Sequence, residues 1–262
     1  MVLVEFLIAI PLGFALGFLI GLTGVGGGAL VAPALYVILG MDYAESVALS
    51  LIYSLFTKIF SAVQHLRQGT VLWRITLLYG LTGIPGAVLG SRVIYWAGGG
   101  THRIFPFLMG GVLLLVSALM LMETAVQAIA SREKPFSPHR ITWQGALAIG
   151  GFQLLVGALM GLTSIGSGSL VILSMVYLFR MSAREIVGSN IVIALIMVIP
   201  AGLTHYLAGG VDWKLLALLL IGSLGGAVLG SKCTMILPDR VLKLAIVALI
   251  VAGAVSTIVK AG

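Results

Sequence analysis

Apolar residues dominate the chain in long runs, and short polar stretches separate one run from the next. The runs predict helices over residues 3–21, 27–40, 45–66, 74–97, 104–122, 142–161, 168–179, 185–207, 214–233 and 240–259. Most runs approach the roughly 20 residues that an α-helix needs to cross a bilayer. The run 27–40 gives only about 21 Å of helix, short of the ~30 Å hydrocarbon core. We therefore expect it, and its counterpart 168–179, to end inside the membrane.

A glycine-rich turn precedes each of these two short runs. The first turn reads "GLTGVGGGAL" at 21–30, and the second reads "GLTSIGSGSL" at 161–170. At the same offset, "GAVLGS" occurs at 86–91 and again at 226–231. One offset held over this distance indicates an internal duplication. The sequence predicts a first repeat over 1–130, a polar linker over 131–140 and a second repeat over 141–262.

Charges in the loops indicate that the two repeats are inverted. If 1–40 crosses the membrane once, the loop lysines and arginines divide evenly between the two sides. If 1–40 and 141–180 are hairpins that return to the side they came from, most of these charges share one side. The positive-inside rule favours the second topology, with the N-terminus outside. The cytoplasmic group is then Arg67, Arg74, Arg132, Lys134, Arg140, Arg180, Arg184, Lys232, Arg240 and Lys243.

These patterns predict an all-α polytopic integral membrane protein built from two homologous, inverted halves. We expect about 8 to 10 transmembrane segments, with broken or re-entrant helices at 1–40 and 141–180. The composition agrees, because 60% of the residues are hydrophobic and 9% are charged, whereas about a quarter are charged in a soluble domain.

The net charge of +7 lies mostly in short loops, which favours lipid headgroups over nucleic acid as its partner. A single cysteine excludes a disulfide within the chain and a Cys-x-x-Cys metal motif. We see no ATP-binding motif and expect no cofactor and no bound metal.

The glycine turns are candidates for a substrate site. Non-helical backbone at membrane depth is tolerated where protein or water satisfies it. A helix that begins there presents unpaired N–H groups and the positive end of its dipole, which bind anions. Close packing alone is the alternative interpretation. The predicted substrate contacts are Thr23, Gly24, Gly26, Gly27 and Gly28 in the first turn, and Thr163, Ser164, Gly166, Ser167, Gly168 and Ser169 in the second.

Other glycines recur at every fourth position and favour close helix packing. They are Gly13, Gly17, Gly21, Gly86, Gly90, Gly226 and Gly230.

The helix 45–66 carries a polar stripe, because its polar residues recur at steps of three and four and share one face. They are Ser50, Ser54, Thr57, Lys58, Ser61, Gln64 and His65. Such a face usually meets protein or a water path rather than lipid. We predict substrate contacts for Ser50, Ser54, Thr57 and Lys58. For Lys58, a pairing within the protein or snorkelling to the interface is the other reading.

Two further features leave alternatives open. Asn190, in the helix 185–207, is either a substrate contact or a packing contact. His65 and His205 occupy matched positions; they are candidates for a proton relay or helix-end residues that meet headgroups or cap a carbonyl. We expect His205 to lie near a surface.

The duplicated turn "GLTGVGGGALVAPAL" and the repeated "GAVLGS" followed by Arg92 or Lys232 resemble the sulfite exporter family called TauE/SafE. The resemblance extends over nearly the whole chain. It implies a multi-pass transporter of the bacterial inner membrane that exports sulfite, sulfoacetate or a related organosulfonate. It also implies that the turns Gly21 to Gly28 and Gly161 to Gly168 carry the family's motif. This chain departs from the motif at 164–169, where serines replace glycines.

The function predicted is a secondary transporter that exports a small anion by alternating access, with the substrate held at the helix breaks near the membrane midplane. We expect the anion and the lipid bilayer as partners, and no nucleic acid. A coupling proton or sodium ion and a homodimer stay open. The alternatives are an intramembrane hydrolase that uses Ser167 and His205, and an anion channel.

Overall fold

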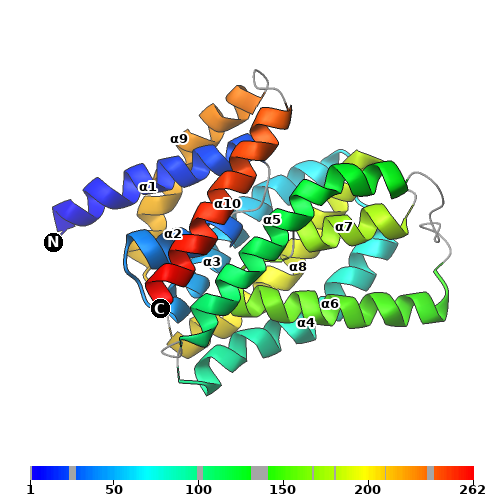
Figure 1. The fold of residues 1–262 in the computed structure, drawn as a ribbon, viewed down its shortest axis with the longest axis horizontal. Helices are drawn as coiled ribbons and strands as arrows, with labels where there is room; N and C mark the ends of the chain where they lie inside the picture. The colour runs from blue at the N-terminus through cyan, green and yellow to red at the C-terminus, as the bar shows by residue number, and fades with distance from the viewer. Residues whose placement is uncertain are drawn as a thin grey trace.

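A computed structural model describes residues 2–23, 28–98, 103–130, 141–166, 168–179, 181–209, 211–234 and 239–262. Within these ranges the chain forms ten α-helices (Figure 1). They are α1 (Val2–Thr23), α2 (Gly28–Ile38), α3 (Tyr43–Arg67), α4 (Trp73–Trp96), α5 (Ile104–Ala130), α6 (Trp143–Thr163), α7 (Ser169–Leu178), α8 (Ala183–Gly209), α9 (Trp213–Thr234) and α10 (Asp239–Ala261).

Six of the described helices are long and apolar enough to cross a membrane by length and composition; they lie in α3, α4, α5, α6, α8 and α9. Helices α2 and α7 have 11 and 10 residues, which corresponds to about 16 Å and 15 Å of helix. Neither reaches across a ~30 Å hydrocarbon core. The broken helices predicted at 1–40 and 141–180 are therefore confirmed.

Polar caps at the helix starts explain several boundaries. Asp42 precedes α3 and accepts a hydrogen bond from the Ala44 backbone N–H at 3.1 Å. Before α8, the Glu185 carboxylate accepts hydrogen bonds from the backbone N–H and the hydroxyl of Ser182, both at 2.8 Å. This reciprocal cap satisfies N–H groups that a helix start leaves unpaired.

The first helix of each half lies against the fourth helix of the other half. Helix α1 packs on α9, and α6 packs on α4, on different sides of the bundle (Figure 1). A Cβ on Gly86 would overlap the Leu154 carbonyl oxygen, and a Cβ on Gly226 would overlap that of Phe14. The two copies of "GAVLGS" thus make the same contact, each with the opposite half.

Glycine is required at these crossings because the two helix backbones touch. Gly13 and Gly17 likewise lie against backbone atoms of α9, and Gly90 lies against backbone atoms of Ala158. In lipid, such close approach provides van der Waals contact that no apolar side chain can supply in the same space. The predicted packing role is confirmed for Gly13, Gly17, Gly86, Gly90 and Gly226, whereas that of Gly21 and Gly230 stays a prediction.

The central pair, α3 and α8, is antiparallel. Gly188, near the start of α8, lies against Thr70, which follows the end of α3. A Cβ placed on Gly202, in the second half of α8, would lie 3.6 Å from the Ile52 side chain, in the first half of α3.

The last helices of the two halves, α5 and α10, are also antiparallel. The Arg103 guanidinium, just before α5, donates to the backbone carbonyl of Gly262, just after α10, at 3.4 Å. Gly110, one to two turns into α5, faces Ile258, one turn from the end of α10. Since α3 matches α8 and α5 matches α10 in the repeat, antiparallel pairing means that the halves are inverted.

The short helices follow the same symmetry. Helix α1 runs parallel to α9, since Gly13 faces Leu219 and Gly17 faces Ser223. Helix α2 runs beside α10 and parallel to it, because Pro33 faces Gly253 and the Tyr36 carbonyl accepts from Lys260. Since α9 and α10 are consecutive long helices joined by a short connection, they run in opposite directions. Helices α1 and α2 therefore form a hairpin.

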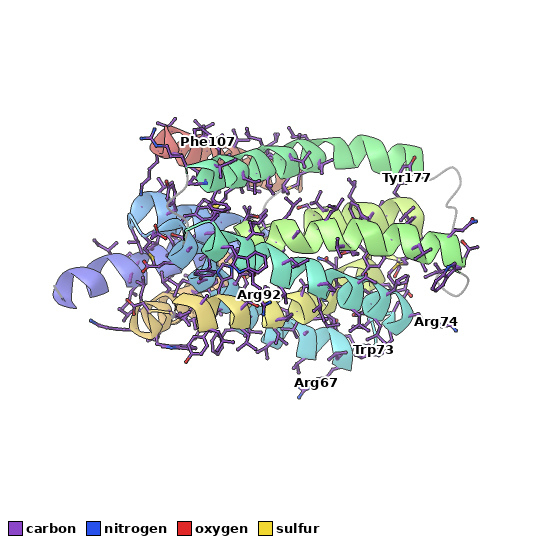
Figure 2. All side chains as sticks on the ribbon, turned by 90° about the horizontal axis from the view of Figure 1, so that it is seen from below. Arg67, Trp73, Arg74, Arg92, Phe107 and Tyr177 are labelled. Carbon is purple, nitrogen blue, oxygen red and sulfur yellow. The ribbon has the colours of Figure 1, made fainter. Side chains whose placement is uncertain are left out.

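Large apolar side chains remain exposed over the outer surface (Figure 2). In a bilayer, lipid covers such a surface. The four tryptophans, Trp73, Trp96, Trp143 and Trp213, each stand at the first or last residue of a helix and are more than half exposed. This placement fits aromatic anchors at the headgroup level.

The glycine contacts give a matched test with neighbouring residues. A Cβ on Gly226 would overlap the Phe14 carbonyl oxygen, whereas a Cβ on Gly225 would lie at an ordinary 3.7 Å from the Phe14 ring. We expect Gly226→Ala to destabilise the protein by about 1–3 kcal/mol, the usual cost of overpacking. Gly225→Ala should be neutral or slightly stabilising. Thermal unfolding in detergent measures both, and equal effects would contradict this packing.

Candidate functional site

The two helix breaks meet inside the bundle. Gly28, the first residue of α2, packs against Ser164, which follows the end of α6. A Cβ on Gly28 would overlap the Ser164 carbonyl oxygen and lie 3.2 Å from the Ser164 Oγ. Both residues are buried. The chain therefore brings two interrupted backbones into direct contact at a place where neither is exposed.

Ser164 holds an unusual conformation at this contact. Its φ is 61°, in the left-handed region, and it is the only non-glycine residue with positive φ among those described. Its backbone N–H donates to the Met160 carbonyl at 2.7 Å and ends α6. Its hydroxyl lies 3.0 Å from the Ser50 hydroxyl on α3. The second break is thereby joined to the polar stripe of α3.

The rest of the second turn is shaped by local hydrogen bonds. The Thr163 hydroxyl donates to the Leu159 carbonyl at 2.7 Å and accepts from the Ile165 N–H at 3.1 Å. Gly166 has a φ of 118°, which favours glycine. Gly168 precedes α7, and no side chain caps that helix start. The first turn of α7 thus begins with backbone N–H groups that no side-chain cap satisfies.

Two side chains brace the last turn of α6 from neighbouring helices. The Tyr43 hydroxyl donates to the Leu162 carbonyl at 2.6 Å. His205 lies 3.0 Å through Nε2 from the Gly161 carbonyl, and its Nδ1 lies 2.9 Å from the Tyr95 hydroxyl. Because a carbonyl only accepts, Nε2 carries the proton, and the Tyr95 hydroxyl donates to Nδ1 when the ring is neutral.

His205 is fully buried, so the prediction that it lies near a surface is wrong. The reason is its reach across the bundle: the ring bonds a carbonyl of α6 rather than a carbonyl at the end of its own helix. The Gly161 carbonyl cannot pass a proton onward, so these contacts give His205 a structural role. Its part in a proton relay stays a prediction.

The polar stripe continues from Ser50 along α3. Ser54, one turn further, is buried, and its hydroxyl has no hydrogen-bond partner. The Thr57 hydroxyl donates to the Ser54 carbonyl at 3.0 Å. Lys58 is half-buried and has no ion pair or hydrogen bond among the residues described. Ser54 and Lys58 are thus unpaired polar groups on one face of α3, which indicate a path that water or a polar ligand occupies.

The stripe ends at His65, which lines a cavity at the far end of α3. Its Nδ1 lies 2.9 Å from the Thr70 hydroxyl. Ser50 and His65 are separated by about 22 Å along the helix axis at 1.5 Å per residue. The predicted contacts on α3 therefore form a column that starts at the breaks, not a single cluster.

Asn190 lies at another level of the bundle from Ser50. The neighbouring Ser189 accepts from the Leu72 N–H at 2.9 Å, beyond the end of α3. Asn190 matches Ser50 in the repeat and is buried, and its Oδ1 has no partner among the described residues. Gln153, inside α6, is buried with both amide atoms unpaired.

Several predicted contacts cannot be placed in this arrangement. Gly24, Gly26, Gly27 and Ser167 lie outside the described residues, as does the side chain of Thr23. Ser169 opens α7 and is half-buried, next to the uncapped helix start.

Sequence reasoning gave no role to the tyrosines that surround the site. Tyr43, Tyr53 and Tyr95 each join two helices through a hydroxyl, Tyr53 by bonding Ser223 on α9. A buried tyrosine must place its hydroxyl on a partner, so its presence inside an apolar run is a signal. The sequence does not say which helix supplies that partner.

Comparison with known proteins identifies relatives over nearly the same length. The model of the family "Sulfite exporter TauE/SafE" matches residues 9–257. The chain is 35% identical over 232 residues to the "Probable membrane transporter protein YjnA" of Bacillus subtilis, covering 85% of this chain and 87% of the relative.

More distant relatives carry the same general description. The "Probable membrane transporter protein YdhB" of Bacillus subtilis is 26% identical over 233 residues, which cover 89% of this chain and 92% of the relative. The "Probable membrane transporter protein MJ0441" of Methanocaldococcus jannaschii is 26% identical over 180 residues, which cover 64% and 62%. No solved structure matches.

These relatives are described as probable membrane transporter proteins, which agrees with a chain whose described residues form helices, six of them long and apolar enough to cross a membrane. The meeting of two broken helices and the match across nearly the whole length lead to one conclusion: this chain is a membrane transporter that belongs to the sulfite exporter TauE/SafE family.

Proposed function

We propose that the protein is a secondary transporter that exports a small anion, sulfite or an organosulfonate such as sulfoacetate, by alternating access. We place it in the inner membrane of a bacterium and the substrate at the meeting of the two helix breaks. The observation that carries the proposal is the contact of Gly28 with Ser164. It supports a site where the start of α2 meets the turn that joins α6 to α7, near the membrane midplane.

The chemistry available at this point suits an oxyanion. The uncapped start of α7 offers backbone N–H groups and the positive end of a helix dipole. The hydroxyls of Ser50 and Ser164 are hydrogen-bonded to each other, which leaves one O–H of the pair to donate to an anion. Lys58 lies about 12 Å further along the α3 axis, and its side chain supplies a positive charge with no competing carboxylate among the described residues. A sulfonate or sulfite group combines negative charge with several acceptor oxygens.

The direction of transport fits the membrane potential. An inside-negative potential drives an anion outward with about 2.3 kcal/mol per charge per 100 mV. Export therefore needs no coupled ion, and a coupling proton or sodium ion remains a question for experiment. The inverted halves provide the symmetry on which alternating access relies.

The other functions considered receive less support. A hydrolase that uses Ser167 and His205 needs a free ring nitrogen as base, yet Tyr95 and the Gly161 carbonyl occupy both nitrogens of His205. An anion channel remains an outcome of the transport test. In proteoliposomes, flux that saturates and shows counterflow supports the transporter, whereas flux without counterflow supports a channel.

Lys58 provides the first test. We expect sulfite or sulfoacetate to raise the melting temperature of the purified protein by mass action. Lys58→Ala should abolish this rise because it removes the positive charge of the stripe, while Lys58→Arg should keep part of it. The same melting measurement is made with a panel of further compounds: sulfate, thiosulfate, taurine and lactate.

Arg67→Ala is the matched control, since Arg67 is an exposed cation at the end of the same helix. Its response should equal that of the unmodified protein. A Lys58→Ala protein that responds normally would show that Lys58 is structural.

Ser164 provides a second test that separates binding from folding. Ser164→Gly relieves a left-handed conformation that costs about 1–2 kcal/mol and loses one hydrogen bond worth about 0.5–1.5 kcal/mol. We expect stability to change little. Anion affinity should fall about tenfold because one hydroxyl donor is gone.

The companion variant is Ser50→Ala. It loses the same hydrogen bond but does not relieve the left-handed backbone of Ser164, so it should be less stable than Ser164→Gly. Thermal unfolding and isothermal titration with sulfite measure the two quantities. Unchanged affinity in Ser164→Gly would remove Ser164 from the substrate site.

A further inference from the structure

A cavity with an arginine in its lining opens at the end of the α3 stripe that lies farthest from the helix breaks. Its volume is about 610 Å³, and its lining residues are His65, Gln68, Thr70, Arg184 and Val187. These residues come from the end of α3, the turn into α4 and the first turns of α8. No function considered so far uses this cavity.

The walls of the cavity are fixed to one another. The Leu72 N–H donates to the Ser189 hydroxyl at 2.9 Å and joins the α3–α4 turn to α8. Gly188 allows Thr70 to approach the α8 backbone so closely that a Cβ would overlap it. Thr70 in turn lies 2.9 Å through its hydroxyl from His65 Nδ1. The cavity therefore has a defined shape rather than being a gap between loose loops.

The charge of the cavity is positive. Arg184 lines it and has no ion pair among the described residues. The neighbouring carboxylate, Glu185, is directed to the Ser182 cap through two hydrogen bonds of 2.8 Å. At the same end of the bundle, Arg67 and Arg74 project outward with Trp73 between them (Figure 2). Such a field concentrates anions at the mouth.

The lining also offers hydrogen-bond donors. The Gln68 amide supplies N–H donors. The Thr70 hydroxyl donates to the His65 carbonyl at 3.2 Å, so Nδ1 of His65 donates to Thr70, and Nε2 of the neutral ring accepts rather than donates. An arginine fork with neutral donors beside it is the arrangement that binds carboxylate, sulfonate and phosphate oxygens.

The cavity lies at the end of the polar stripe of α3. His65 shares the α3 face with Ser50, Ser54 and Lys58, and this face reaches the second break through Ser50. The loop charges place this end of α3 on the cytoplasmic side. An anion that leaves the cell enters the transporter from that side.

The opposite end of the bundle differs. A smaller cavity of about 280 Å³ is lined there by Arg92, Tyr95, Trp96, Thr204, Leu207 and Ala208. The hydrogen bonds from Tyr95 to His205 and from His205 to the Gly161 carbonyl stand between that cavity and the second break. Among the described residues, no such pair of hydrogen bonds lies between the cavity at His65 and Ser50.

From these observations we propose that the cavity around Arg184 is an entrance site that captures the oxyanion substrate from the cytoplasm before it reaches the helix breaks. The proposal rests on the proposed function for the direction and the class of substrate. Arg184 binds the oxygens of the arriving anion, and the α3 stripe leads it past Lys58.

Transport from the cytoplasmic side tests the entrance site. In inside-out vesicles that take up sulfite, Arg184→Gln should raise KM about tenfold, the loss expected for one charged hydrogen bond. The maximal rate should stay near that of the unmodified protein. The sulfite-induced rise in melting temperature at saturating sulfite should also persist, because the site at the breaks is intact.

Two matched controls carry the same loss of charge. Arg67→Gln removes a cation at the same end that does not line the cavity, and Arg92→Gln removes one from the opposite cavity. Arg92→Gln should leave the KM for uptake into inside-out vesicles unchanged. Arg67→Gln should raise this KM much less than Arg184→Gln does, because Arg67 adds only to the field at the mouth. An equal rise of KM in Arg67→Gln and Arg184→Gln would overturn the entrance site in favour of a general surface field.

Val187 gives a version of the test that leaves the Ser182–Glu185 cap untouched. It lines the cavity and is 43% exposed, so a charged side chain fits without burial. Val187→Glu should raise KM and Val187→Lys should lower it, with both effects shrinking at high salt. If neither substitution moves KM, the entrance site is wrong.

The two proposals fail in distinguishable ways. If the unmodified protein neither transports nor is stabilised by any anion of the panel, the proposed function fails. If it transports sulfite and Arg184→Gln has the same KM, only the entrance site fails.

Discussion

The contact between two interrupted helices governs this architecture. A bilayer offers no water to satisfy exposed backbone groups, so a helix that stops at membrane depth must end against protein. Here the start of α2 packs on the turn after α6, and Tyr43, His205 and Ser50 brace the residues Gly161 to Ser164. The remaining helices form a shell that keeps lipid away from this point. The polar stripe of α3 provides the one described column of hydroxyl and ammonium groups that reaches it.

Much of the fold can be predicted from the sequence because lipid imposes simple rules. Apolar run length sets the helices, and the expected bounds, such as 74–97 for α4 and 142–161 for α6, fall within a few residues of those found. The short runs beside glycine turns marked the broken helices, and the balance of loop charges indicated inversion. Each of these signals is local or additive along the chain.

The site is less predictable because it depends on which helices become neighbours. The sequence marked Ser164 as a candidate contact but not its left-handed backbone or its bond to Ser50. It placed His205 near a surface, because a histidine late in a helix usually is, and gave no sign that Gly161 would be its partner. The sequence pattern assigns Arg184 to the charges of a loop. Its place in a cavity with His65 follows from the antiparallel pairing of α3 and α8.

The exchange of first helices between the halves has a consequence for biogenesis. The glycine face of α1 finds its partner on α9, which the ribosome makes almost at the end of synthesis. Until α9 is made, α1 has no partner helix to pack against. The contact of α6 with α4 is therefore the first of the two crossings that can form. A chain truncated after α8 would therefore form the α4–α6 crossing but leave the glycine face of α1 in contact with lipid.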